Sequence, residues 1–336
     1  MRNVALFEQR SFLNGVNTIS FSDCAPQVQY EYAIAYYLKK QYPEVEIPPL
    51  ACAKPMMGNT EYWTTVVRSF LWSDPEEPIR PFSDQDLYLP DAQWVISRKT
   101  MGGHTAAFAA KGGHNDEPHN HNDLGSFLFD VDEEVFLCDL GGGLYTKQYF
   151  GDESYQMLVN GSQGHSVPIV DGIFQKEGRQ SCAEKVDAVI GEDAVTFSAD
   201  IAKAYPGSGL KSLLRKLTFA KKENPSLLIQ DTAVFADAVR PLTERLITKF
   251  PVTVEKNQAV IRGNKGELVL TGSKGTFFVS QTSYKRKADE PDVEVYLLDL
   301  ILNPNEPGQT GGDDTDGRTR EVSICASYRQ RKNDSQ

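Results

Sequence analysis

All five histidines of this 336-residue chain lie between positions 104 and 165. The densest stretch, residues 118–127, reads PHNHNDLGSF and contains His119, His121 and Asp123. In an extended segment alternate residues share a face, so we expect these three side chains to project in the same direction. Imidazole and carboxylate groups side by side can ligate zinc or transfer protons. The stretch is therefore the first candidate for a metal or catalytic site.

Two further stretches can complete a metal site. Asp139 ends a predicted strand that forms a hairpin with the strand after the histidine stretch, so the hairpin returns it towards His121. His165 lies in a polar turn that leads into another strand. Together His121, Asp139 and His165 supply two imidazoles and one carboxylate, a common set for an open zinc site. A structural polar network is the alternative interpretation of the same residues.

Other polar residues nearby favour structural roles. His104 and His114 follow pairs of glycines, which is typical of loop tips. The glycines at 141–143 lack the Lys-Ser/Thr of a phosphate loop and predict a turn, one that could let a ligand approach the backbone. Three tyrosines could hydrogen-bond a sugar or carry a proton, but core packing is the first expectation for each: Tyr145, Tyr149 and Tyr155.

The hydrophobic pattern divides the chain into a helical and a strand-rich part. Apolar residues recur at helical spacing over residues 27–42 and 60–74. From about residue 90 short runs of period two follow one another without helical patterns between them, which predicts an antiparallel β-sandwich. We therefore expect a helical segment at 1–88, a sandwich at 89–328 and a polar tail at 329–336. The helical segment is too small to enclose a core, so it should pack on the sandwich.

Composition excludes several classes of protein. With 40% hydrophobic and 24% charged residues, the chain is typical of folded domains. A net charge of −11 argues against nucleic acid or an anionic membrane as the partner. The chain shows neither the apolar run of a membrane span nor the apolar core of a secretory signal, so we expect a cytoplasmic location for the chain as given, unless it is a fragment. Oligomeric state is left open.

Three ordered blocks, taken together, resemble the heparinase II/III-like polysaccharide lyases. The blocks are Gly112-Gly113 with residues 117–127, then residues 139–145, then Ser162 and His165 with residues 170–172 and Gln175. The resemblance is specific over residues 90–176 and weaker over the strand-rich remainder to about residue 328. It implies a carboxyl-terminal antiparallel β-sandwich preceded by the end of a helical (α/α) toroid.

The resemblance also implies an activity, β-elimination on uronic-acid-containing glycans. It assigns proton transfer to His119 and the family's metal, zinc before calcium, to His121, Asp139 and His165. An acidic polysaccharide or oligosaccharide is the implied substrate. The family's catalytic tyrosine and its carboxylate-neutralising Asn or His belong to the toroid, farther upstream than this chain reaches. Three interpretations follow: the chain is a fragment, another chain supplies the missing groups, or the chain binds without cleaving.

Two alternatives belong to other functional classes. A non-catalytic carbohydrate-binding β-sandwich would fit if the toroid residues are missing. A cupin-like metal-binding barrel also places H-x-H on one strand and a later histidine on another, although residues 124–126 lack the Glu that a cupin places after its second histidine. Release of an unsaturated sugar product separates a lyase from a binding module.

Overall fold

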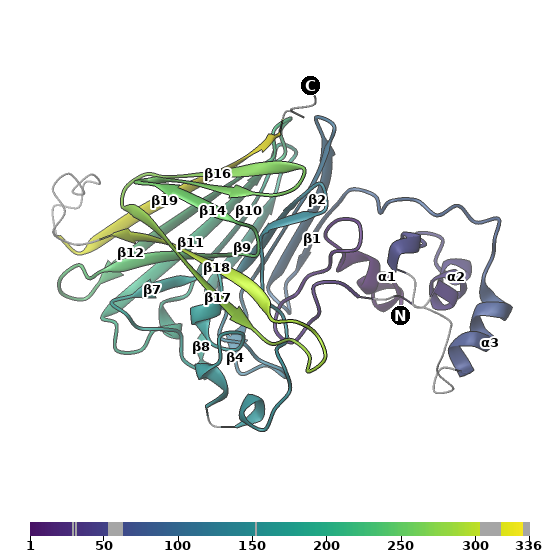
Figure 1. Cartoon of the computed structure of the whole chain (residues 1–336), viewed down its shortest axis with the longest axis horizontal. Helices are drawn as coiled ribbons and strands as arrows, with labels where there is room; N and C mark the ends of the chain where they lie inside the picture. Colours follow the sequence, from purple (N-terminus) through teal and green to yellow (C-terminus); the bar gives the residue numbers. More distant parts are fainter. Residues whose placement is uncertain (29, 31, 53–62, 152, 303–316, 332–336) are drawn as a thin grey trace.

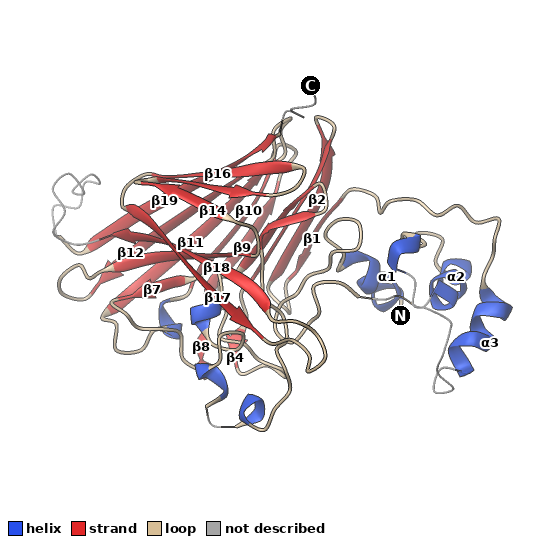
Figure 2. Cartoon of the chain, in the orientation of Figure 1, coloured by secondary structure: helices blue, strands red, loops and turns tan. Residues whose placement is uncertain are grey.

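The computed structural model describes residues 1–28, 30, 32–52, 63–151, 153–302 and 317–331 (Figure 1). Strands form most of it, and its α-helices all precede residue 73 (Figure 2). Every pairing between these strands is antiparallel. The predicted fold class, an antiparallel β-sandwich preceded by a short helical segment, is confirmed.

Four sheets make up the strand-rich part within the described residues. An eight-stranded sheet has, in spatial order, β14 (Val252–Glu255), β15 (Gln258–Arg262), β16 (Gly266–Gly272), β19 (Thr319–Gln330), β12 (Ser226–Phe235), β11 (Leu210–Ala220), β10 (Ala194–Asp200) and β9 (Glu184–Ile190). A five-stranded sheet has β1 (Gln85–Leu89), β2 (Trp94–Met101), β3 (His104–Lys111), β5 (Phe127–Val131) and β6 (Glu134–Leu137). A four-stranded sheet has β17 (Thr276–Tyr284), β18 (Val293–Leu302), β13 (Leu242–Thr248) and β7 (Pro168–Val170), and a small sheet pairs β4 (His114–Asn115) with β8 (Gly178–Cys182).

One hydrophobic core joins the three larger sheets. Residues of β12 alternate between buried and half-buried along the whole strand, the period expected when one face meets a core. Phe108 and Phe129 of the five-stranded sheet each lie 6.0 Å from Phe219 of the eight-stranded sheet, between ring centroids. Strand β5 is buried at every position, because its outer face is also covered.

The cover on that outer face comes from the chain before the sandwich. Leu13, Ile19 and Phe21 pack in one buried cluster with Ala109 and Leu128 of the five-stranded sheet. This contact places residues 13–24 directly against the sandwich, beside the ends of β5 and β6. We predicted that the helical amino-terminal segment packs on the sandwich. Its main contact there is made by a loop and not by a helix.

The α-helices lie to one side of the sandwich (Figure 1). They are α1 (Arg2–Arg10), α2 (Tyr32–Gln41) and α3 (Trp63–Trp72). Helix α1 was not predicted, α2 begins later than the expected residue 27, and part of the second predicted helix lies outside the described residues. No helix in the described part of the chain is long and apolar enough to cross a membrane.

The predicted domain boundaries stay predictions. Strand β1 begins at Gln85, before the expected start of the sandwich at residue 89. Strand β19 continues to Gln330, inside the expected polar tail, and residues 332–336 lie outside the described part of the chain.

Candidate functional site

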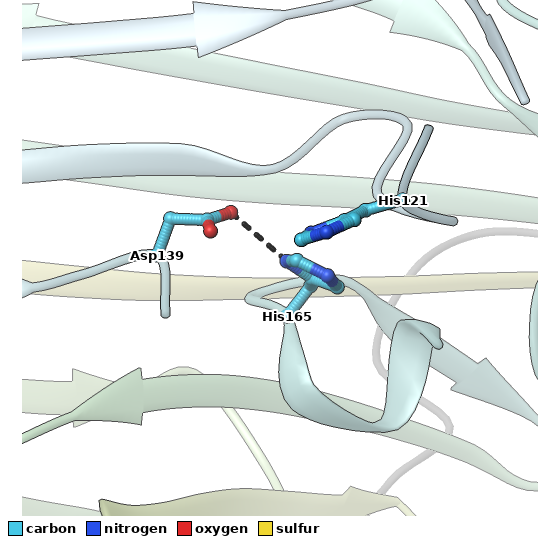
Figure 3. A group of neighbouring side chains, drawn as sticks. All are labelled: His121, Asp139 and His165. Atoms are coloured by element: carbon cyan, nitrogen blue, oxygen red, sulfur yellow. Dashed lines mark hydrogen bonds and ion pairs between the residues drawn. The ribbon is translucent and has the colours of Figure 1, made fainter. Parts of the chain in front are cut away.

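Three of the predicted site residues come together at one end of the β5–β6 hairpin. Asp139 follows β6, His121 lies in the loop between β4 and β5, and His165 follows a single 3-10 turn at Ser162–Gly164. One ligand atom from each lies within 4.8 Å of the other two, and all three side chains are buried. Figure 3 shows them pointing toward one another from three separate loops. The predicted ligand set is thus a spatial cluster.

Hydrogen bonds fix the orientation of His165. Its Nδ1 lies 2.9 Å from Oδ2 of Asp139, and its Nε2 lies 2.9 Å from the carbonyl oxygen of Val159. A carbonyl oxygen and an ionised carboxylate only accept, so in the metal-free protein both nitrogens carry a hydrogen, and a metal bound at Nδ1 would replace the one that faces Asp139. Burial alone would lower the pKa of His165, but the charge of Asp139 outweighs it and raises that pKa. In this buried site the carboxylate of Asp139 therefore favours the protonated form of His165.

The unpartnered nitrogen of His121 indicates whether these residues fit a metal. Nε2 of His121 lies 3.1 Å from Oδ1 of Asp23 and 3.3 Å from the hydroxyl of Tyr149. Nδ1 is buried, and no described residue offers it a hydrogen bond. Leaving a buried polar atom unpaired costs about 1–3 kcal/mol, and a cation bound by that nitrogen would remove the cost. Two imidazoles and a carboxylate also suit zinc, so the residues fit a divalent metal.

His119 has a different environment from His121 although one residue separates them. Its side chain is 65% exposed, and its backbone has a φ of +58°, a left-handed conformation that is uncommon outside glycine. The expectation that residues 119–123 are extended, with three side chains on one face, is therefore wrong. The left-handed residue turns His119 outward, while His121 points into the buried cluster. Such outliers are frequent at functional sites.

A cleft of about 350 Å³ opens beside His119. Its lining is polar and aromatic: Asp23, Glu117, His119, Asn120, Tyr149, Phe150, Ser154, Tyr155 and Asn160. Tyr145, which is 54% exposed, lies against Phe150 with 5.0 Å between ring centroids. Of the three tyrosines expected in the core, Tyr149 is buried, whereas Tyr145 is exposed and Tyr155 lines this cleft. A sugar could contact aromatic surface and hydrogen-bonding groups here.

Asp23 is the residue of the candidate site that sequence reasoning missed. Its carboxylate accepts hydrogen bonds from His119 (2.8 Å), from His121 (3.1 Å), from Tyr145 (2.8 Å) and from Tyr149. Burial alone would raise the pKa of Asp23, but the bonds from these four side chains outweigh it and hold that pKa well below its usual range. Asp23 lies almost 100 positions before the histidines. No local pattern around it could have indicated the contact.

Asp123, the third residue of the expected face, belongs to the frame and not to the metal cluster. Its Oδ1 lies 2.6 Å from Nζ of Lys111, and both side chains are buried. An unpaired buried charge is costly, so the pair fixes the loop at the start of β5. Asp123 therefore has a structural role in this loop and is not one of the candidate metal ligands.

Buried polar side chains tie the first and third blocks of the motif together. Arg215 donates to the backbone oxygens of Gly125 (3.2 Å) and Ser166 (2.7 Å), and forms ion pairs with Asp231 and Glu244. Gln175 accepts from the backbone nitrogen of Leu124 and donates to its carbonyl oxygen. These bonds hold the His121 and His165 loops at a fixed separation.

The remaining two histidines do not join the site. His104 begins β3 after the Gly102-Gly103 turn and pairs with Asp132 at the opposite end of the β5–β6 hairpin. His114 lies in β4, 3.0 Å from Arg179.

Comparison with known proteins shows which family the chain resembles in sequence and which solved structures it resembles in fold. Residues 84–326 match the family described as heparinase II/III-like, C-terminal. Among solved structures, heparan sulfate lyase HepC from Pedobacter heparinus is 14% identical, with a TM-score of 0.67 over 98% of this chain and 47% of that chain. The heparinase III-BT4657 gene product is 11% identical, with a TM-score of 0.68 over 98% of this chain and 46% of that one.

These likenesses establish the fold. A third structure, a heparinase III, is 12% identical with a TM-score of 0.65 over 99% of this chain and 49% of that chain. The chain thus spans about half the length of the structures that it matches. No curated protein matches it at significant similarity. The sandwich and the family match leave the cupin-like barrel without support.

Proposed function

This chain belongs to the heparinase II/III-like family, and on that basis we propose that it acts in β-elimination on uronic-acid-containing glycans. In this proposal it supplies a proton-transfer histidine, His119, and a divalent metal centre formed by His121, Asp139 and His165. The substrate is an acidic polysaccharide or oligosaccharide.

The observation that carries the proposal is the placement of His119. The ring projects at a cleft lined by aromatic and polar side chains, next to the buried candidate metal cluster. Nδ1 is held by Asp23, and within the described residues Nε2 has no hydrogen-bond partner. An exposed imidazole with one nitrogen anchored and the other free is suited to exchange protons with a bound ligand.

The chemistry of elimination defines what this histidine would do. The C5–H bond next to the uronate carboxylate breaks, a C4–C5 double bond forms, and the C4–O4 bond breaks with protonation of the leaving oxygen. Nε2 of His119 would take up or deliver one of these protons. Positioned acid–base groups of this kind typically contribute about 10²- to 10⁴-fold in rate.

The metal centre would support binding of an anionic sugar. A divalent cation, zinc in preference to calcium given the two imidazoles, would supply positive potential beside the cleft of a chain whose net charge is −11. His121, a candidate ligand, lies 3.3 Å through its Nε2 from the hydroxyl of Tyr149, which lines the cleft. One structural relative is named a heparan sulfate lyase, so glycosaminoglycans are the first substrates to test.

Groups outside this chain remain part of the proposal. The resemblance assigns a tyrosine and a carboxylate-neutralising Asn or His to the helical toroid. Tyr145 and Tyr149, whose hydroxyls both donate to Asp23, do not replace them, because both hydroxyls are already engaged.

An absorbance assay tests the proposal. The longest form of the protein, with the helical toroid that the resemblance implies, is incubated with heparan sulfate, chondroitin, hyaluronan and alginate, and the ultraviolet absorbance of the unsaturated product is followed. We expect product from at least one glycan, lost in His119→Ala and kept in the control His114→Ala.

Absence of product from every glycan, with retained glycan binding, would contradict the lyase proposal. That outcome would favour the alternative of a non-catalytic carbohydrate-binding sandwich, which binding of the same glycans to immobilised protein would establish.

A further inference from the structure

We infer that Asp23 is a positioning residue that assigns the two neighbouring histidines to different tasks, fixing His121 for the metal and His119 for proton transfer. The inference rests on the proposed function for the task of His119, and on the metal cluster alone for that of His121.

Each oxygen of the Asp23 carboxylate accepts a hydrogen bond from a different histidine. Oδ2 accepts from Nδ1 of His119 at 2.8 Å and from the hydroxyl of Tyr145 at 2.8 Å. Oδ1 accepts from Nε2 of His121 at 3.1 Å and from the hydroxyl of Tyr149. Four donors therefore converge on a side chain that is only 12% exposed.

An ionised carboxylate only accepts, so each imidazole nitrogen facing Asp23 must carry a hydrogen. For His119 this places the proton on Nδ1 and leaves Nε2 with a lone pair at the cleft. For His121 it places the proton on Nε2 and leaves Nδ1, the buried nitrogen without a partner among the described residues, free to ligate a cation. The same acceptor thus produces opposite tautomers in two rings that are separated by one residue.

The glycines at 141–143 give this arrangement independent support. A Cβ at Gly141 would lie 2.3 Å from the carbonyl oxygen of Cys24, and one at Gly142 would lie 3.1 Å from that of Asp23. Gly141 also has a φ of +66°, which favours glycine. The sequence suggested that a ligand approaches the backbone of this turn, whereas the structure shows the chain segment that carries Asp23 in that place.

The first experiment compares Asp23→Asn with Asp116→Asn. Asp116 is exposed in the same loop as the histidines, and its side chain has no hydrogen bond within the described residues, so the control changes the local charge equally. Metal-free protein is titrated with Zn²⁺ against a competing chelator. We expect Asp23→Asn to weaken Zn²⁺ binding about 10- to 100-fold, as loss of a carboxylate behind a metal-bound histidine does, and the control to leave it unchanged. Where product forms, kcat should fall while KM stays within about twofold.

Unchanged Zn²⁺ affinity and kcat in a folded Asp23→Asn protein would overturn the inference. If that variant does not fold, the wild-type protein decides the question through its imidazole tautomers. Nitrogen NMR of histidine-labelled, metal-free protein should show His119 protonated on Nδ1 and His121 on Nε2, while the commoner Nε2 tautomer at His119 would contradict it. If no glycan yields product, the proposed function fails, and the Zn²⁺ and tautomer results still test the part of Asp23 in the metal site.

Discussion

The two ends of the β5–β6 hairpin each carry a histidine–aspartate pair, and only one of them builds a candidate metal centre. At the turn, Nδ1 of His104 lies 2.7 Å from Oδ2 of Asp132. At the opposite end, Nδ1 of His165 lies 2.9 Å from Oδ2 of Asp139. The pairs are nearly identical in distance, so distance does not distinguish them.

What differs is the set of neighbours around each pair. The carboxylate of Asp132 also accepts from the Tyr328 hydroxyl at 3.2 Å and the Thr105 nitrogen at 3.0 Å, and the pair borders an open polar cleft of about 750 Å³. Asp139 instead faces a second imidazole, that of His121, whose Nδ1 has no partner among the described residues. A histidine beside an aspartate is therefore common structural chemistry, and a third ligand with an unpaired atom is what indicates a metal.

The largest expected effect is the loss of metal from one end only. We expect one divalent metal per chain in the wild type and in His104→Ala, and none in His165→Ala, because the latter removes one of three protein ligands. Elemental analysis of folded protein prepared without chelators measures this. Unchanged metal in His165→Ala would remove His165 from the site, and wild-type protein without metal would remove the site.

The next effect concerns the buried network behind the metal end. Replacing Arg215 with Met should destabilise metal-free protein by about 3–5 kcal/mol, because it leaves Asp231 and Glu244 as buried, unpaired acids. Urea unfolding provides the measurement. The matched control is Arg262→Met, which removes a half-exposed pair with Glu267 and should cost less than about 1 kcal/mol. Equal losses in the two variants would contradict the structural role of Arg215.

A pH effect distinguishes the other end of the hairpin. Burial raises the pKa of Asp130 to about 7, against an ordinary value of 3.8, despite hydrogen bonds from Asn17 and Asn14. A raised folded pKa means that the native state binds more protons, so this stabilisation is complete below pH 3.8 and is lost as the pH rises towards 7.

Between these limits, the free energy of unfolding of the wild type should fall by up to about 1.4 kcal/mol per pH unit relative to Asp130→Asn. Urea unfolding of both metal-free proteins at several pH values measures the difference. Parallel pH profiles would show that Asp130 titrates normally.

The sandwich and the metal cluster could be predicted from the sequence because both follow from patterns within short stretches of the chain. Alternation of apolar residues predicts strands, and the strand pair around residues 127–137 brings Asp139 back to the His121 loop. Helix α1 was missed because its apolar face is small, with only Ala5 and Leu6 buried. Asp23 could not be found at all, because its place depends on Leu13, Ile19 and Phe21 docking on the outer face of a sheet formed by residues far along the chain.

The sequence pattern also did not predict the conformation of the histidine stretch. An alternating H-x-H-x-D reads as an extended segment, but a single left-handed residue, His119, breaks the alternation. The outcome is that Asp123 reaches Lys111 and His119 reaches the cleft, while His121 alone of the three faces Asp139. Backbone strain of this kind depends on tertiary contacts, here the bond to Asp23.

The central claim is that one intervening residue separates a proton-transfer histidine from a metal-binding histidine. The direct measurement takes His119→Ala and His121→Ala in the longest active form of the protein, and determines metal content and the rate of unsaturated-product formation on the same samples. The account predicts that His119→Ala keeps its metal and loses about 10²- to 10⁴-fold in rate, whereas His121→Ala loses its metal. Loss of metal from His119→Ala, or full activity in that variant, would contradict it.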